Sequence, residues 1–149
     1  MNLSKNFTLE EMTVSEYADR NNLINKPSDE ILSEMKRLAD FLEKVRIVFD
    51  RPIHINSAFR SQEVNKAIGG QKNSQHCKGQ AADIRIAGLT PDQIIRNIIA
   101  SGLEYDQIIR EFNSWVHLSI PAQNAKARKI ANAVASPTFK ARRVSAVII

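Results

Sequence analysis

The feature that most constrains the fold is a row of apolar residues at helical spacing between Ile31 and Val48. Successive members lie three or four residues apart, so they share one side of an α-helix that must be buried. Ser28 precedes the row as an N-cap and Pro52 follows it, which limits the helix at both ends. The members are Ile31, Met35, Leu38, Leu42, Val45 and Val48, with Phe41 and Phe49 adding bulk. We therefore expect a long amphipathic helix that packs on the core.

Shorter helices and strands surround this helix in the sequence. Thr8 and Glu11 form a capping box that opens a short helix, and Thr90 with Pro91 opens another that ends at Gly102. A further short helix is expected at 61–68, and strands are expected at 53–59, 81–86, 105–111 and 115–120. Helices early in the chain and strands later are typical of an α+β domain. We expect a small antiparallel β-sheet packed against helices.

The distribution of charge divides the 149-residue chain, whose length suits one domain, into two parts. No acidic residue follows Glu111, and the residues before it are close to neutral. Six basic residues follow it, namely Lys126, Arg128, Lys129, Lys140, Arg142 and Arg143. Residues 1–121 thus form the body, and 122–149 form a basic segment that is either an edge strand near 128–134 or a tail. Such a segment is either a solvated end or a site for nucleic acid, an anionic membrane or an anionic wall polymer.

Several classes of protein are excluded by what the sequence lacks. No apolar run reaches the roughly 18 residues that a membrane span needs. The first eleven residues carry acids and no apolar stretch, so we expect synthesis in the cytoplasm without a signal peptide. Cys77 is the only cysteine, which excludes an internal disulfide and a thiolate zinc cluster, and we interpret it as a small filler residue.

Two of the three histidines lie near an acidic residue in a suggestive order. His76 lies in a polar loop, Asp83 begins the following strand, and His117 lies on the strand expected at 115–120. Two imidazoles and one carboxylate are a standard set of catalytic zinc ligands that leaves a fourth position open. These residue types alone also fit histidines with a structural role, which is how we interpret His54.

Three sequence blocks occur in an order that resembles the zinc D-Ala-D-Ala carboxypeptidase family. They are S-A-F-R-S at 57–61, S-x-H-x-x-G-x-A-x-D at 74–83 and W-x-H at 115–117. The family includes phage endolysins and shares its fold with the hedgehog signalling domain, and the resemblance covers about residues 7–120. It implies a hedgehog-type fold, a zinc peptidase domain over 1–121 and one zinc ion per chain, held by His76, Asp83 and His117.

The resemblance also implies roles for residues around the metal. Arg60 matches the family arginine that faces the substrate near the scissile carbonyl or a terminal carboxylate, and a guanidinium suits both groups. Ser74, in the central block, is placed on the substrate side. Trp115 shares the strand face of His117 and either walls the substrate cleft or packs in the core.

The general base is assigned to Glu111 as the residue that takes a proton from the attacking water and hands it to the leaving amine. Many family members place an acid three residues before the last histidine, where this chain has Ser114. Others place a glutamate six residues before it, which is Glu111 here. A turn of Asn113 and Ser114 alone would turn Glu111 away from the metal, whereas a three-residue loop or a bulge would place it on the face of His117.

These inferences predict a zinc metallopeptidase that hydrolyses stem peptides of bacterial peptidoglycan, as a D-Ala-D-Ala carboxypeptidase or an endopeptidase. The absence of a signal sequence suggests a phage-encoded lysis enzyme that acts on the wall after release or as a virion component. One alternative is a zinc-containing wall-binding module without catalysis, consistent with Ser114. The other is a nucleic-acid-binding protein that uses the basic segment, although only Phe139 there could stack on bases.

Overall fold

The structure is a computed structural model that describes residues 1–134. Its helices are α1 (Leu9–Met12), α2 (Glu16–Arg20), α3 (Asp29–Phe49), α4 (Gln62–Ala67) and α5 (Pro91–Ser101). Its strands are β1 (His54–Ser57), β2 (Ala81–Arg85), β3 (Gln107–Glu111), β4 (Trp115–Ser119) and β5 (Ile130–Val134). None of the helices in this part of the chain is both long and apolar enough to cross a membrane.

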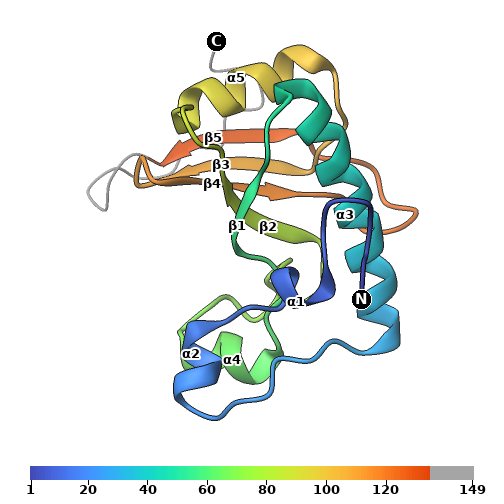
Figure 1. The fold of residues 1–149 in the computed structure, drawn as a ribbon, viewed down its shortest axis with the longest axis vertical. Coiled ribbons are helices and arrows are strands. Elements are labelled where there is room, and N and C mark those ends of the chain that lie inside the picture. Colours follow the sequence, from blue (N-terminus) through green and yellow to red (C-terminus); the bar gives the residue numbers. More distant parts are fainter. Residues whose placement is uncertain (135–149) are drawn as a thin grey trace.

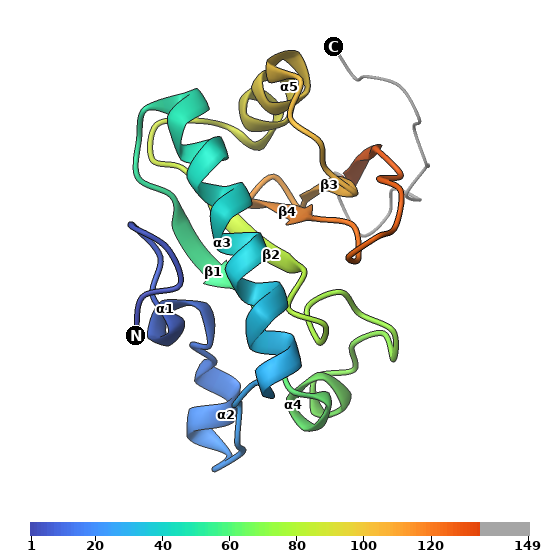
Figure 2. The ribbon, with the colours of Figure 1, turned by 90° about the vertical axis from the view of Figure 1, so that its right-hand side faces the viewer.

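The five strands form one sheet in the order β1-β2-β4-β3-β5. Helix α3 runs across one face of this sheet, and α5 lies beside it (Figures 1 and 2). The short helices α1, α2 and α4 lie beyond the end of the sheet at which β1 ends and β2 begins. The architecture is therefore a layer of helices on one face of a mostly antiparallel sheet, which confirms the α+β class expected from the sequence.

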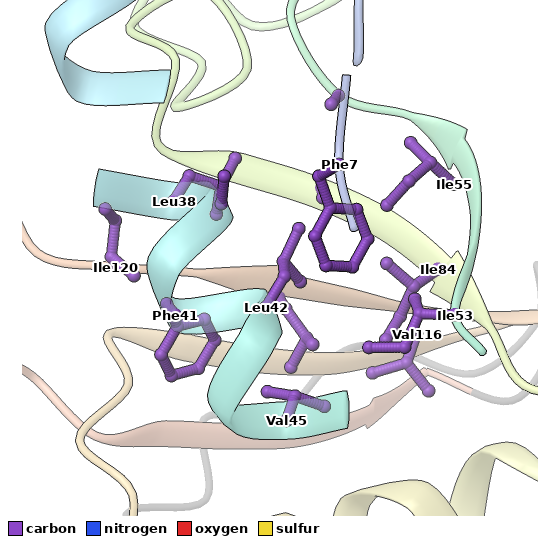
Figure 3. Close-up of a cluster of buried hydrophobic side chains, with 14 of the residues drawn as sticks. Phe7, Leu38, Phe41, Leu42, Val45, Ile53, Ile55, Ile84, Val116 and Ile120 are labelled. Carbon is purple, nitrogen blue, oxygen red and sulfur yellow. The ribbon is translucent and has the colours of Figure 1, made fainter. Parts of the chain in front are cut away.

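The core lies between α3 and the sheet, as the apolar row of α3 requires. Figure 3 shows side chains of α3 facing those of β2 and β4, with the ring of Phe7 from the N-terminal segment beside them. Leu38, Leu42 and Val45 of α3 are fully buried, and so are Ile84 and Val116 of the sheet. Each such side chain stabilises the fold by about 2 kcal/mol through removal of apolar surface from water. Helix α3 therefore fixes which face of the sheet is buried and leaves the other face for function.

The strand β5 differs from the antiparallel sheet expected from the sequence, because it runs parallel to β3. Strand β4 ends where β3 begins, since Ser119 pairs with Gln107. The chain then passes across that end of the sheet, and Ile130 pairs with the same Gln107 on its other side. A strand that starts there can only run in the direction of β3, so the parallel pair follows from a short connection.

Local elements agree with the sequence patterns in kind but are shorter at several ends. Ser28 caps α3 as expected, and Thr8 and Thr90 both form complete capping boxes. The strand expected at 53–59 is confined to β1, and helix α2 was not expected. Helix α2 has only five residues and no apolar periodicity, and its N-cap is the single local signal that the sequence offers.

Candidate metal centre

His76, Asp83 and His117 converge at one point, although the first and the last are 41 positions apart in the sequence. Strands β2 and β4 bring two of them together, because Asp83 and His117 are directly opposed in the ladder. His76 comes from the loop that leads into β2. The three candidate ligand atoms all lie within 4.8 Å of one another.

The distances within this group fit a tetrahedral zinc site. The Oδ1 atom of Asp83 lies 3.3 Å from Nε2 of His76 and 3.0 Å from Nδ1 of His117. Two ligands that each lie about 2.1 Å from a tetrahedral zinc ion are about 3.4 Å apart. The two imidazole rings meet edge to face at 66°, with centroids 5.1 Å apart. The donor set and its spacing therefore suit zinc and leave a fourth position for water or substrate.

A backbone carbonyl selects the nitrogen of His76 that faces the metal position. Nδ1 of His76 lies 2.6 Å from the carbonyl oxygen of Ala58, in a site where the side chain is almost wholly buried. A carbonyl can only accept a hydrogen bond, so Nδ1 carries the hydrogen and Nε2 keeps its lone pair free. Such a partner behind a ligating histidine fixes both the tautomer and the ring orientation.

The glycine of the central sequence block allows this loop to approach α3. Gly79 has a φ of +72°, and a Cβ atom built there would lie 2.8 Å from Cγ of Met35 and 2.9 Å from the carbonyl oxygen of Ile31. Any other residue at this position would have a strained backbone, and its Cβ atom would clash with α3. The backbone N–H of Gly79 also donates to the carbonyl of His76, which closes the turn that presents the ligand.

The two histidines control the charge of Asp83. Burial by itself would raise the pKa of this carboxyl, but hydrogen bonds and charge interactions with His117 and His76 outweigh it. The pKa of Asp83 therefore lies well below its usual range, and the group is a carboxylate at neutral pH. An ionised carboxylate is the form that binds a metal ion.

The β3–β4 hairpin places Glu111 beside the metal position. Glu111 pairs directly with Trp115, so the loop between the strands contains three residues, 112–114, and not the two-residue turn of Asn113 and Ser114. Glu111 consequently shares the sheet face of His117. Burial raises the pKa of Glu111, and the nearby Asp83 carboxylate raises it further. A carboxyl group with a raised pKa next to a metal position has the properties of a general base.

Arg60 contacts the His76 loop, to which Ser74 belongs. The backbone N–H of Arg60 donates to the carbonyl of His76 at 3.2 Å, and its guanidinium reaches the Ser74 hydroxyl at 3.5 Å. Its Nε atom is buried without a partner among the described residues. The Ser74 hydroxyl also accepts from the backbone N–H of His76. Ser74 thus supports the loop, while its expected contact with substrate remains a prediction.

The remaining candidates and one unexpected aromatic residue lie at the margins of the site. The Nε1 atom of Trp115 is buried without a partner in residues 1–134, and its ring meets that of Phe112 edge to face at 6.3 Å. Phe112 is 47% exposed and adopts a φ of +53° in the hairpin loop. No pattern in the sequence predicts this position for Phe112. His54 is exposed on the edge strand β1, whereas Cys77 is buried.

Comparison with known proteins agrees with this geometry. A family model described as Peptidase M15 matches residues 5–119 of the chain. The matched range includes all three candidate ligands as well as Glu111 and Arg60. A search of curated proteins finds no match. With the family model covering most of its length and a His-Asp-His metal site in place, the chain belongs to the M15 family of zinc metallopeptidases.

Proposed function

We propose that this protein hydrolyses peptide bonds in the stem peptides of bacterial peptidoglycan. The observation that carries the proposal is that Glu111 lies on the sheet face of His117, near enough to the His76, Asp83 and His117 cluster for these groups to shift its pKa. The substrate class is suggested by the family, whose D-Ala-D-Ala carboxypeptidase members are the ones that the three sequence blocks resemble. Hydrolysis requires a metal position, a base and an anion-binding group, and the site offers a candidate for each.

Each residue of the site has a separate role in the proposed hydrolysis. His76, Asp83 and His117 would hold the zinc ion, which when bound acts as a Lewis acid on the scissile carbonyl and the attacking water. Glu111 takes the proton of that water and passes it to the leaving amine. Arg60 donates hydrogen bonds to the carbonyl oxygen as its negative charge develops, or to a terminal carboxylate of the substrate. Trp115, on the sheet face of His117, would form part of the wall of the substrate cleft.

The identity of the bond and the biological setting belong to the same proposal. The arginine suits a terminal carboxylate, as in a D-Ala-D-Ala carboxypeptidase, and equally suits the carbonyl of an internal bond in an endopeptidase. We further propose a phage-encoded enzyme, made in the cytoplasm, that reaches the wall after release or as part of the virion. The supporting argument is the resemblance of the three sequence blocks to a family that includes phage endolysins.

The basic segment is proposed to attract the enzyme to anionic wall polymers. Its charges Lys140, Arg142 and Arg143 lie outside the described residues, so this argument rests on the sequence. A near-neutral body gains little long-range attraction to an anionic wall, whereas clustered basic residues supply it. Such attraction acts over about 8 Å at physiological ionic strength and weakens as salt is added.

Mass spectrometry of digested peptidoglycan tests the proposed activity and identifies the bond. Purified sacculi are incubated with the zinc-loaded protein and with its Glu111→Gln variant as a matched control. New free termini within the stem peptides are expected only with the wild-type protein. A zinc-loaded wild-type protein that binds sacculi and releases no peptide would instead support the wall-binding alternative.

A further inference from the structure

One buried carboxylate, that of Asp106, ties the His76 loop to the segment that follows β4. Asp106 is 3% exposed and lies immediately before β3. The side-chain amide of Gln75, the residue before His76, donates to its Oδ2 atom at 2.9 Å. The backbone N–H of Arg128 donates to Oδ1 at 3.0 Å, and the guanidinium donates to both oxygens at 2.5 to 3.1 Å. The His76 loop and the segment after β4 therefore both donate hydrogen bonds to the Asp106 carboxylate.

The backbone of Asp106 is fixed from both sides, which gives this carboxylate a defined position. Its N–H donates to the carbonyl of Ser119 at 2.8 Å, and its carbonyl accepts from the N–H of Ile130 at 2.9 Å. The amide of Gln75 also reaches the carbonyl of Ile120 at 3.3 Å. The end of β4 and the start of β5 thus hold Asp106 in place, and Gln75 is anchored to that fixed point.

The charge of Arg128 makes the arrangement stable. Burial of Asp106 would by itself raise its pKa, but hydrogen bonds from Arg128 and Gln75 outweigh this effect, and the pKa lies below its usual value. The group is thus a carboxylate at neutral pH and accepts from both neighbours. A buried carboxylate that lost its cationic partner would be strongly unfavourable. The hydrogen bond from Gln75 to Asp106 therefore depends on the ion pair between Asp106 and Arg128.

We propose that Asp106 is a positioning residue for the metal centre, which is held by Arg128 and in turn fixes Gln75 and the backbone that presents His76. Arg128 lies beyond the range 5–119 that the family model matches. The segment between β4 and β5 would then take part in forming the site, in addition to any role of the basic residues in wall attraction. The inference rests on the zinc site of the proposed function and is independent of the substrate.

The zinc dissociation constant, measured by competition with a chromophoric chelator, tests the link between Gln75 and Asp106. Gln75→Glu keeps the size of the side chain but places a second carboxylate against Asp106. We expect the dissociation constant to rise about tenfold or more, the usual scale for groups that orient a metal ligand. Adding Asp106→Asn to this variant supplies an amide donor to the new glutamate. We expect the double variant to recover only part of the lost affinity, because the new amide no longer offers Arg128 a carboxylate.

A second pair of variants tests the contribution of Arg128. Arg128→Ala should also raise the zinc dissociation constant, and Arg128→Lys should restore part of the affinity because it keeps the charge but not the fork. Lys126→Ala is the matched control, since Lys126 is an exposed basic residue of the same segment, and it should bind zinc as the wild type does. If Gln75→Glu fails to fold, as judged by circular dichroism, the zinc dissociation constants of Arg128→Ala and Arg128→Lys test the positioning role.

Two results separate this inference from the proposed activity. Wild-type zinc affinity in the folded Gln75→Glu and Arg128→Ala proteins, with only a lower unfolding temperature, would overturn the positioning role. If the variants lose zinc as expected but the wild-type protein cleaves no wall peptide, the proposed substrate fails and the positioning role stands.

Discussion

Glu111 lies directly opposite Trp115 across the β3–β4 hairpin, and this register places the Glu111 carboxylate on the sheet face that carries His117. The strands alternate their side chains between two faces, so a shift of one residue would have turned Glu111 toward α3. The three-residue loop avoids that shift. Phe112 and Asn113 both adopt positive φ in this loop, and Ser114 donates its backbone N–H to the carbonyl of Glu111.

The first prediction concerns the metal ligands. Wild-type protein should bind one zinc ion per chain, while His76→Ala and His117→Ala should each lose stoichiometric zinc, because two remaining ligands hold the ion weakly. Atomic absorption after dialysis against a weak chelator measures the content. His54→Ala serves as the control with full zinc content, since His54 is exposed on β1 away from the ligands. Full occupancy in both ligand variants would refute the assignment.

The second prediction concerns the general base. Glu111→Gln keeps the shape of the side chain and removes its capacity to accept a proton, so turnover should fall about 100-fold or more. Zinc content and unfolding temperature should stay close to those of the wild type. The measurement is the initial rate on a soluble stem peptide, with Ser114→Ala as a control of unchanged rate. A Glu111→Gln protein that works at the wild-type rate would assign the base to another group.

The third prediction concerns Arg60. Arg60→Lys retains a positive charge but cannot donate two parallel hydrogen bonds to one carbonyl or carboxylate. We expect kcat/KM on the soluble peptide to fall at least tenfold without loss of zinc, on the scale of a lost oxyanion donor or weaker. Lys78→Arg, an exposed change in the His76 loop that Arg60 contacts, should leave the rate unaltered. An unchanged rate for Arg60→Lys would mean that the guanidinium does not meet the substrate.

The fourth prediction compares two glycines that share a left-handed backbone. Gly79 and Gly69 have φ values of +72° and +76°, but only a Cβ atom at Gly79 meets other atoms within 4 Å. Both alanine variants should lose about 1 kcal/mol of unfolding free energy to backbone strain. Gly79→Ala should lose about 2 kcal/mol more, because the new methyl group presses on α3. Urea unfolding measures both, and equal losses would contradict the close approach of the His76 loop to α3.

The fifth prediction concerns the C-terminal basic residues. Replacing Lys140, Arg142 and Arg143 with glutamine should lower binding to purified sacculi at low salt, and the difference should shrink as salt is added. Cleavage of a small soluble peptide should be unchanged, since the metal ligands and Glu111 all precede residue 120. Co-sedimentation with sacculi measures the first effect. A collapse of the soluble-peptide rate would show that these residues belong to the catalytic unit.

The sequence alone predicted the features that depend on near neighbours in the chain. Helix α3 follows from apolar spacing and the Ser28 cap, and α5 follows from Thr90 and Gly102, because capping and amphipathicity act within a few residues. The three candidate ligands were identified from the residues and spacing of short sequence motifs. Their convergence is confirmed by the structure, whereas the catalytic roles of Glu111 and Arg60 remain predictions.

Tertiary structure decided the features that depend on pairing between distant segments. Both hairpin registers were open from the sequence, because a turn of two residues and a loop of three are each compatible with the residues between Glu111 and Trp115. The parallel direction of β5 and the contact of Asp106 with Gln75 and Arg128 had no local signal at all. Register and long-range ion pairs are set by the balance of burial and hydrogen bonding over the whole sheet, and no short stretch of sequence contains that balance.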